Sequence, residues 1–195
     1  MRVIAGRYKG TTLRCGRGPF FRPTAQIVKG SIFDTLGEAV REASFLDLFA
    51  GSGAIGIEAL SRGASRAVFV EQDRRILKAL RTNLERCRIP AEQAVVVGQD
   101  VFRFIQRLEK VDERFDIIFA DPPYAGATAR RVVDAVLKAK RRLCGTLVVE
   151  HGEPLGAEGD IRAPHRSRRF GQTRVTYIDM GNGGEAEGKE GGPRE

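Results

Sequence analysis

Residues 45–56, with the sequence FLDLFAGSGAIG, decide the fold of this chain. The stretch begins as an apolar run that carries a single carboxylate, Asp47, and passes through alternating glycines into helix-forming residues from Ala54. This order predicts a buried strand, a tight turn and the first turn of a helix. Glycine is needed in such a turn because the backbone adopts positive φ angles and lets a ligand approach its N–H groups. We therefore expect a nucleotide-like cofactor there, with a glycine turn that binds no ligand as the alternative.

The identity of the cofactor depends on charge. Gly51, Gly53 and Gly56 match the dinucleotide fingerprint G-x-G-x-x-G. Glu71 follows at about the spacing of a ribose-binding acid, so the pattern by itself leaves NAD open. Asp47, however, would lie beside the anionic pyrophosphate of a dinucleotide and repel it. S-adenosylmethionine carries a net positive charge, which suits this acidic turn better, and it is the cofactor that we expect.

Strand and helix patterns alternate along the rest of the chain. We expect helices over residues 25–41, 54–62, 73–88, 101–109 and 128–142, and further strands over residues 67–71, 94–98, 115–120 and 145–150. Short β-prone segments predict an antiparallel hairpin at each end, over residues 2–15 and 161–180. This order predicts an α/β fold with a Rossmann-like doubly wound sheet, mostly parallel and closed by the C-terminal hairpin.

Acidic residues end or closely follow five of the predicted strands: Asp47, Glu71, Asp100, Asp121 and Glu150. Doubly wound sheets bind their ligands beyond the carboxyl ends of the strands, so we expect these side chains to line the site. Five acids at one edge are more than the packing of a sheet requires.

The sequence Asp121-Pro122-Pro123-Tyr124 suits methyl transfer to the amine of a nucleobase. Such an amine is a poor nucleophile because its lone pair is delocalised into the ring. The Asp121 carboxylate and the Pro122 carbonyl can accept hydrogen bonds from its two N–H groups and favour its pyramidal form, a preorganised electrostatic contribution. Tyr124 can stack on a base that has left its own stack. We predict these four residues to be catalytic; a proline turn that only ends a strand is the alternative.

The distribution of the net charge of +8 indicates a polyanionic partner. No acid precedes Asp34, whereas seven basic residues do: Arg2, Arg7, Lys9, Arg14, Arg17, Arg22 and Lys29. Tyr8 lies among them and could stack on a base. The closing hairpin is also basic and includes Arg168 and Arg169. A solvated basic face that serves only solubility is the alternative for both groups.

Composition divides the chain into three parts. We expect a basic hairpin extension over residues 1–24, a methyltransferase domain over residues 25–180 and a disordered tail rich in Gly and Glu over residues 181–195. There is neither an apolar run near 18 residues nor a signal-peptide pattern, which predicts a cytoplasmic protein without a membrane partner. Three widely spaced cysteines predict no metal site, and two histidines, His151 and His165, are expected to be polar loop residues. We expect a monomer.

These motifs together resemble the RsmD family, within the amino-methylating branch of the class I S-adenosylmethionine-dependent methyltransferases. The resemblance covers residues 1–180 and rests on G-x-x-[KR]-G at 6–10, RPT at 22–24, LDLFAGSGAIGIEALSRGA at 46–64, VEQD at 70–73, DPPY at 121–124, VVEH at 148–151 and FGQTR at 170–174. It implies the class I methyltransferase fold and methylation of a guanine N2 in small-subunit (16S) ribosomal RNA, within a ribosomal assembly particle.

The resemblance also implies roles for individual residues. Asp47, Gly51 and Gly53 would hold the methionine end of the cofactor, Glu71 would bind the ribose hydroxyls, and Asp100 would lie near the adenine. The residues predicted to bind the cofactor are Asp47, Phe49, Ala50, Gly51, Ser52, Gly53, Glu71, Gln72, Asp100, Val101 and Asp121. Those predicted to bind RNA are Arg2, Arg7, Tyr8, Lys9, Arg14, Arg22, Thr24, Arg168 and Arg169.

One departure from the family pattern and three rival functions remain. The family usually has R-E-[ST] in the helix after RPT, whereas this chain has Lys29-Gly30-Ser31, and glycine weakens a helix interior by about 1 kcal/mol relative to alanine. Because DPPY also serves other amines, an adenine-N6 or cytosine-N4 methyltransferase is the first rival. A ribosome-assembly RNA-binding module and a dehydrogenase are the others.

Overall fold

The computed structural model contains one seven-stranded sheet within the residues that it describes, which are 1–14, 23–108, 113–123, 128–139, 143, 145–156 and 160–181. Its strands are β1 (Ser44–Leu48), β2 (Arg66–Glu71), β3 (Ala94–Gly98), β4 (Ile117–Ala120), β5 (Thr146–His151), β6 (His165–Phe170) and β7 (Thr173–Asp179). The spatial order is β3-β2-β1-β4-β5-β7-β6. The first five strands in that order are parallel, and β7 and β6 join antiparallel. The predicted fold class is therefore confirmed.

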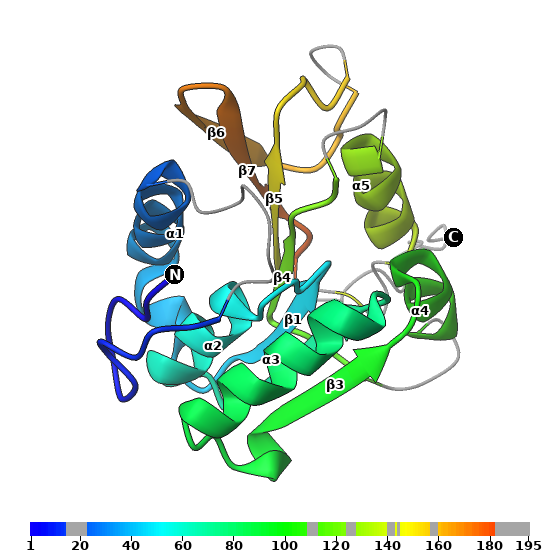
Figure 1. Cartoon of the computed structure of the whole chain (residues 1–195). Coiled ribbons are helices and arrows are strands. Elements are labelled where there is room, and N and C mark those ends of the chain that lie inside the picture. The colour runs from blue at the N-terminus through cyan, green and yellow to red at the C-terminus, as the bar shows by residue number, and fades with distance from the viewer. Residues whose placement is uncertain are drawn as a thin grey trace, which may run out of the picture.

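Helices cover both faces of the sheet (Figure 1). One face carries α1 (Pro23–Leu36), α2 (Ala54–Ser61) and α3 (Arg74–Arg86), and the other carries α4 (Val101–Leu108) and α5 (Thr128–Lys138). Two short 3-10 helices, η1 (Gly37–Val40) and η2 (Ala91–Gln93), precede β1 and β3. Of the helices that the structure describes, none has the length and apolarity needed to span a membrane.

The central strands are buried on both faces because their side chains alternate between the two helical layers. On β1, Phe45 packs under α1, α2 and α3, whereas its neighbour Leu46 packs under α4 and α5. The same alternation separates Phe69 from Val68 on β2. This two-sided burial explains why these strands appear in the sequence as continuous apolar runs.

The N-terminal segment, residues 1–14, pairs with itself and then docks on α2. Arg2 and Thr12 form an isolated antiparallel bridge, so the predicted hairpin is present as a single bridge and not as two named strands. Glu58 on α2 accepts hydrogen bonds from the Ile4 and Ala5 amides at 2.8 and 2.9 Å. The segment is thereby fixed to the helix that follows the glycine turn.

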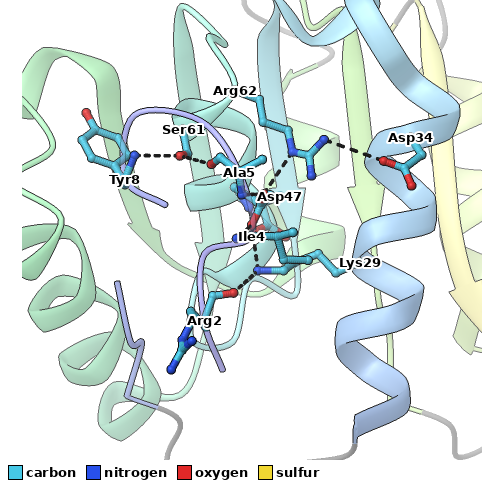
Figure 2. A network of polar contacts seen from close by, with 11 residues as sticks. Arg2, Ile4, Ala5, Tyr8, Lys29, Asp34, Asp47, Ser61 and Arg62 are labelled. Atoms are coloured by element: carbon cyan, nitrogen blue, oxygen red, sulfur yellow. Dashed lines mark hydrogen bonds and ion pairs between the residues drawn. The ribbon is translucent and has the colours of Figure 1, made fainter. Parts of the chain in front are cut away.

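A buried ion pair completes this docking. Lys29 Nζ on α1 lies 2.9 Å from Glu58 Oε2. It also donates a hydrogen bond to the Arg2 carbonyl at 2.7 Å (Figure 2). Burial alone would raise the pKa of Glu58, but the Ile4 amide, Lys29 and Arg62 outweigh it and lower that pKa. Lys29 is 1% exposed, so its inclusion in the basic surface was wrong. The pair is tolerated because hydrogen bonds satisfy both charges.

Several predicted boundaries were wrong. Helix α1 begins at Pro23 and not after a Thr24 cap. Proline suits the first position of a helix because its φ angle is helical and because the N–H groups of the first turn have no partner within the helix, so the missing N–H costs nothing. The helix ends before Gly37, whose φ of 54° breaks the helical path. His151 and His165 lie in β5 and β6, not in loops. The proposed domain limits and the tail remain predictions.

Replacing Gly30 by alanine should stabilise the protein. A Cβ at this position of α1 would meet only the Ile4 Cδ1 atom at 3.9 Å, an ordinary contact. We expect Gly30→Ala to raise the free energy of unfolding by about 0.5–1 kcal/mol in urea denaturation, because alanine favours the helix. Gly56→Ala is the matched control and should destabilise, since its Cβ would lie 2.3 Å from the Phe69 ring. A loss of stability in Gly30→Ala would contradict the prediction.

Candidate active site

The turn after β1 has the backbone geometry that the glycine pattern predicts. Gly51 and Gly53 have φ angles of 54° and 79°, which only glycine adopts freely. Phe49 shares this left-handed conformation at 61°, which costs about 1–2 kcal/mol for a side chain with a Cβ. Gly56 is needed for a different reason, namely the close packing of α2 against Phe69 on β2. The turn is therefore strained and held by its neighbours, as functional turns often are.

Asp47 joins the end of β1 to the first turn of α2. It is 1% exposed, and its Oδ2 accepts a hydrogen bond from the Gly56 amide at 2.9 Å. Burial and the nearby charge of Glu71 raise the pKa of Asp47 to about 7, although the Gly56 amide lowers it. This carboxylate is thus poised to ionise fully when a cation approaches.

Glu71 lies at the tip of β2 and binds the glycine turn through its side chain. Its Oε2 accepts from the Gly51 amide at 3.1 Å, and its Oε1 accepts from the Gln72 and Asp73 amides at 2.8 and 2.9 Å. Asp73 in turn caps α3 by accepting from the Arg75 and Ile76 amides, as the sequence predicted. These bonds fix the Glu71 carboxylate beside the turn; its predicted contact with a ribose remains a prediction.

Asp100 follows β3 and begins α4. Its Oδ1 accepts from the Arg103 amide at 3.0 Å, an N-cap contact. The next residue, Val101, is buried under the other face of the sheet. The adjacent β3 and β2 end in register, with Glu71 opposite Gly98. Asp100 and Glu71 therefore lie at the same edge of the sheet, as their predicted roles require.

Asp121 and the two prolines follow β4, the neighbour of β1. Pro122 is buried, whereas Asp121 and Pro123 are exposed. Surrounding protein and the charges of Glu150 and Asp47 raise the pKa of Asp121 well above its ordinary value. The Asp121 residue is exposed, and solvent weakens both of these effects, so the upward shift of its pKa is smaller than burial of the whole group would give.

Three carboxylates therefore converge where the order of the strands reverses. Asp47 lies on β1, Asp121 follows β4, and Glu150 lies on β5. The charges of Asp47 and Glu150 both act on Asp121. Each would be more stable with a positive charge nearby. Within the described residues no cluster of His, Cys, Asp and Glu has the form of a metal site. The arrangement favours an organic cation over an anionic dinucleotide.

The residues predicted to bind RNA occupy two exposed segments. Arg2, Arg7, Lys9 and Arg14 are exposed on the N-terminal segment, and Arg168 and Arg169 are exposed on β6. Tyr8 instead is buried (9% exposed), with the Arg7 guanidinium 5.7 Å from its ring centroid. Base stacking by Tyr8 remains a prediction and would require the ring to leave its packed position.

Helix α1 contacts both basic segments. Lys29 bonds to Arg2 of the N-terminal segment, and Ser31 Oγ lies 3.5 Å from Arg168 Nη1 of β6. Residues two apart on a helix do not share a face, so the segments contact different sides of α1. Two predicted residues, Arg22 and Tyr124, lie outside the described residues. Thr24 lies in α1, but the structure does not describe its side chain.

A buried polar chain at the end of β5 was missed by the sequence analysis. His151 Nδ1 lies 2.5 Å from the Glu153 carbonyl and must donate to it, because a carbonyl only accepts. The His151 Nε2 then accepts from the Thr176 hydroxyl at 2.8 Å, and Thr176 lies 2.7 Å from Ser167 Oγ. Burial lowers the pKa of His151, in agreement with a neutral ring. The chain fixes β5 next to Glu150.

A cavity of about 210 Å³ lies away from the carboxylates. Glu42, Ser65 and Gln93 line it, and these residues precede β1, β2 and β3. It thus lies near the amino ends of the parallel strands, the edge opposite to the one where doubly wound sheets bind ligands. We therefore do not assign this cavity to the active site.

The family model described as Conserved hypothetical protein 95 matches residues 1–179 of this chain. The chain belongs to this family. A Haemophilus influenzae relative named Ribosomal RNA small subunit methyltransferase D is 36% identical over 124 residues, 64% of each chain. YlbH of Bacillus subtilis is 41% identical over 124 residues, 64% of this chain and 67% of that protein. The chain thus aligns with about two thirds of these relatives, and its resemblance to the RsmD family is confirmed.

Solved structures of similar proteins support the fold of this family member. A hypothetical protein of Thermus thermophilus has a TM-score of 0.78 and 28% identity, over 92% of this chain and 99% of that one. The 16S rRNA N2 G1207 methyltransferase RsmC of T. thermophilus, in complex with AdoMet and guanosine, has a TM-score of 0.64 and 25% identity. That match covers 84% of this chain and 44% of the RsmC chain.

Removing the charge of Asp47 should change how stability depends on pH. The pKa of Asp47 is about 7 in the folded protein against 3.8 ordinarily, so between these values the folded state binds a proton that the unfolded state lacks. Wild-type stability contributed by this group therefore falls as pH rises from about 4 to 7. Asp47→Asn keeps a carbonyl acceptor for the Gly56 amide but cannot titrate. In urea denaturation at pH 5, 6, 7 and 8, the free energy of unfolding of the variant minus that of the wild type should increase up to about pH 7 and level off by pH 8. A pH-independent difference would contradict this account.

Proposed function

We propose that this protein transfers the methyl group of S-adenosylmethionine to the exocyclic N2 amine of a guanine in small-subunit ribosomal RNA. The observation that carries the proposal is the convergence of Asp47, Asp121 and Glu150 beside a strained glycine turn. Family membership and the names of the relatives support the same activity. We further propose that the protein acts as a cytoplasmic monomer on RNA within a ribosomal assembly particle.

The glycine turn and its acids fit the proposed cofactor chemically. S-adenosylmethionine supplies an electrophilic methyl group on a positively charged sulfur. Asp47 would bind near its methionine end, where the raised pKa of this buried carboxyl group means that a positive charge would be favourable. Glu71, already fixed by three backbone amides, would accept from the ribose hydroxyls. Asp100 would approach the adenine from the end of β3.

The Asp121-Pro122-Pro123 segment would hold the amine that receives the methyl group. The Asp121 carboxylate and the Pro122 carbonyl would accept its two N–H groups, which lets the nitrogen lone pair point at the methyl carbon. When the methyl group moves from sulfur to nitrogen, positive charge would develop on the nitrogen, and the Asp121 carboxylate would stabilise it. The neutral thioether of the cofactor would leave, and Asp121, whose pKa is raised, would accept the proton that the nitrogen loses. Stacking of the base on Tyr124 is part of the proposal, although Tyr124 is not among the residues that the structure describes.

The two basic segments would hold the RNA backbone on either side of α1. Arg2, Arg7, Lys9 and Arg14 on one segment and Arg168 and Arg169 on the other are exposed and can neutralise phosphates. Both segments contact the same helix, which supports RNA contacts on two sides of α1. Such contacts position RNA without reading its sequence, so base identity would be selected at Asp121 and Pro122.

Transfer of a labelled methyl group tests this function directly. The protein is incubated with S-adenosylmethionine labelled in its methyl group and with unmodified small-subunit particles, and the RNA is digested for nucleoside mass spectrometry. We expect N2-methylguanosine. Asp121→Ala should lower the rate constant for transfer by at least about 100-fold, because a preorganised acceptor is lost, with a much smaller change in cofactor affinity. Label in methyladenine or methylcytosine would retain the enzyme class and reject the proposed base, and no transfer despite cofactor binding would reject the function.

The proposed RNA contacts predict a change in salt dependence. Arg7→Ala/Lys9→Ala removes two exposed cations from the N-terminal segment. The slope of log K against log salt for RNA binding should become shallower by roughly 1.4, at about 0.7 for each phosphate contact with single-stranded RNA. Arg107→Ala, which removes an exposed arginine from α4 on the other face of the sheet, is the matched control and should leave the slope unchanged. Equal slopes in the double variant and the control would reject this part of the RNA surface.

A further inference from the structure

Asn83 connects the N-terminal segment to the glycine turn through a single side chain. It lies on α3 and is 0% exposed. Its Oδ1 accepts from the Arg14 amide at 2.7 Å, and its Nδ2 donates to the Arg14 carbonyl at 2.8 Å. The same Nδ2 donates to the Ser52 carbonyl at 2.9 Å. One amide group therefore satisfies backbone atoms of two segments that are far apart in the sequence.

Asparagine has the donor and acceptor groups that this position requires. Both of its amide hydrogens and its carbonyl oxygen are used, and all its partners are backbone groups. Aspartate has a similar shape but cannot donate, and its charge would face the carbonyl oxygens of Arg14 and Ser52. Alanine would leave all three backbone groups without this partner in a buried place.

The two linked segments belong to the two proposed binding surfaces. Arg14 is an exposed basic residue of the N-terminal segment, whose other end is held on α2 by Glu58 and Ser61. Ser52 lies between the two left-handed glycines of the cofactor turn. The N-terminal segment is thus held by α1, α2 and α3, and the Asn83 contact on α3 also reaches the cofactor turn.

We propose that Asn83 is a positioning residue that couples RNA binding to cofactor binding, an inference that rests on the function proposed above. RNA bound to the N-terminal segment restricts the motion of Arg14, and through Asn83 it restricts the Ser52 carbonyl. The cofactor then binds to a turn that is already ordered and loses less conformational entropy. Because such coupling is reciprocal, the cofactor must strengthen RNA binding by the same factor.

The coupling factor is measurable without turnover. S-adenosylhomocysteine, which has no methyl group to donate, is titrated calorimetrically into the protein with and without saturating unmodified small-subunit particles. For the wild type we expect the RNA to lower the Kd of S-adenosylhomocysteine by about fivefold or more. In Asn83→Asp and Asn83→Ala the ratio of the two Kd values should approach one, because the link between the segments is lost.

A matched variant separates coupling from general destabilisation. Leu84→Ala truncates the neighbouring buried residue of α3 and leaves the Asn83 side chain intact. It should lower the melting temperature yet keep the wild-type coupling factor. A coupling factor of one in the wild type, or an unchanged factor in the Asn83 variants, would overturn the proposal. A matching loss of coupling in Leu84→Ala would also overturn it, because stability alone would then account for the effect.

Hydrogen exchange of the wild-type protein provides a test that needs no variant to fold. S-adenosylhomocysteine alone should slow amide exchange in peptides that cover residues 1–14, although these residues lie outside the proposed cofactor site. Unchanged exchange there, with slower exchange over residues 49–56, would overturn the coupling. The methyl-transfer assay keeps the two proposals distinct: transfer to RNA without coupling rejects only the role of Asn83, whereas absence of transfer rejects the function itself.

Discussion

The hydrogen bond from the Gly56 amide to the buried Asp47 carboxylate is the contact on which the site depends. It ties the end of β1 to the first turn of α2 across the glycine turn. A side chain at residue 56 would strike the Phe69 ring at 2.3 Å and approach Asp47 Oδ2 at 3.1 Å, so helix, strand and carboxylate are packed as one unit. The strained Phe49 backbone follows from this closure, because the chain must reverse within a few residues between β1 and α2.

Repulsion among carboxylates gives the site its preference for a cation. Asp47 lies in the protein interior, and Asp121 is repelled by both Asp47 and Glu150. An arrangement chosen only for stability would not gather like charges at the point where the strand order reverses. A positively charged ligand would relieve this repulsion, so the groups that repel one another in the free protein would favour the bound state. The neutral His151 chain supports β5 without adding another charge.

The N-terminal segment is an integral part of the domain surface. Lys29 and Glu58 hold it from two helices, and Ser61 and Asn83 bind its backbone further along. Its exposed arginines are therefore carried on a fixed backbone, which would reduce the entropy lost in the phosphate contacts that we propose. This docking also explains the burial of Tyr8, whose ring serves the interface between the segment and the domain.

Local patterns in the sequence determined the sheet, the glycine turn and the row of acids, because strand burial and turn geometry depend on residues close together in the chain. The fold class and the family assignment follow from these patterns and are confirmed. Only the tertiary structure determined which isolated polar residues are buried and which groups they contact. Lys29 looked like a surface cation, Asn83 carried no recognisable signal, and the motifs that contain Glu58 and His151 did not reveal which atoms these side chains contact. Their partners lie 27 residues away for Lys29 and Arg2, and 69 residues away for Asn83 and Arg14, so only folding brings the paired atoms within hydrogen-bonding distance.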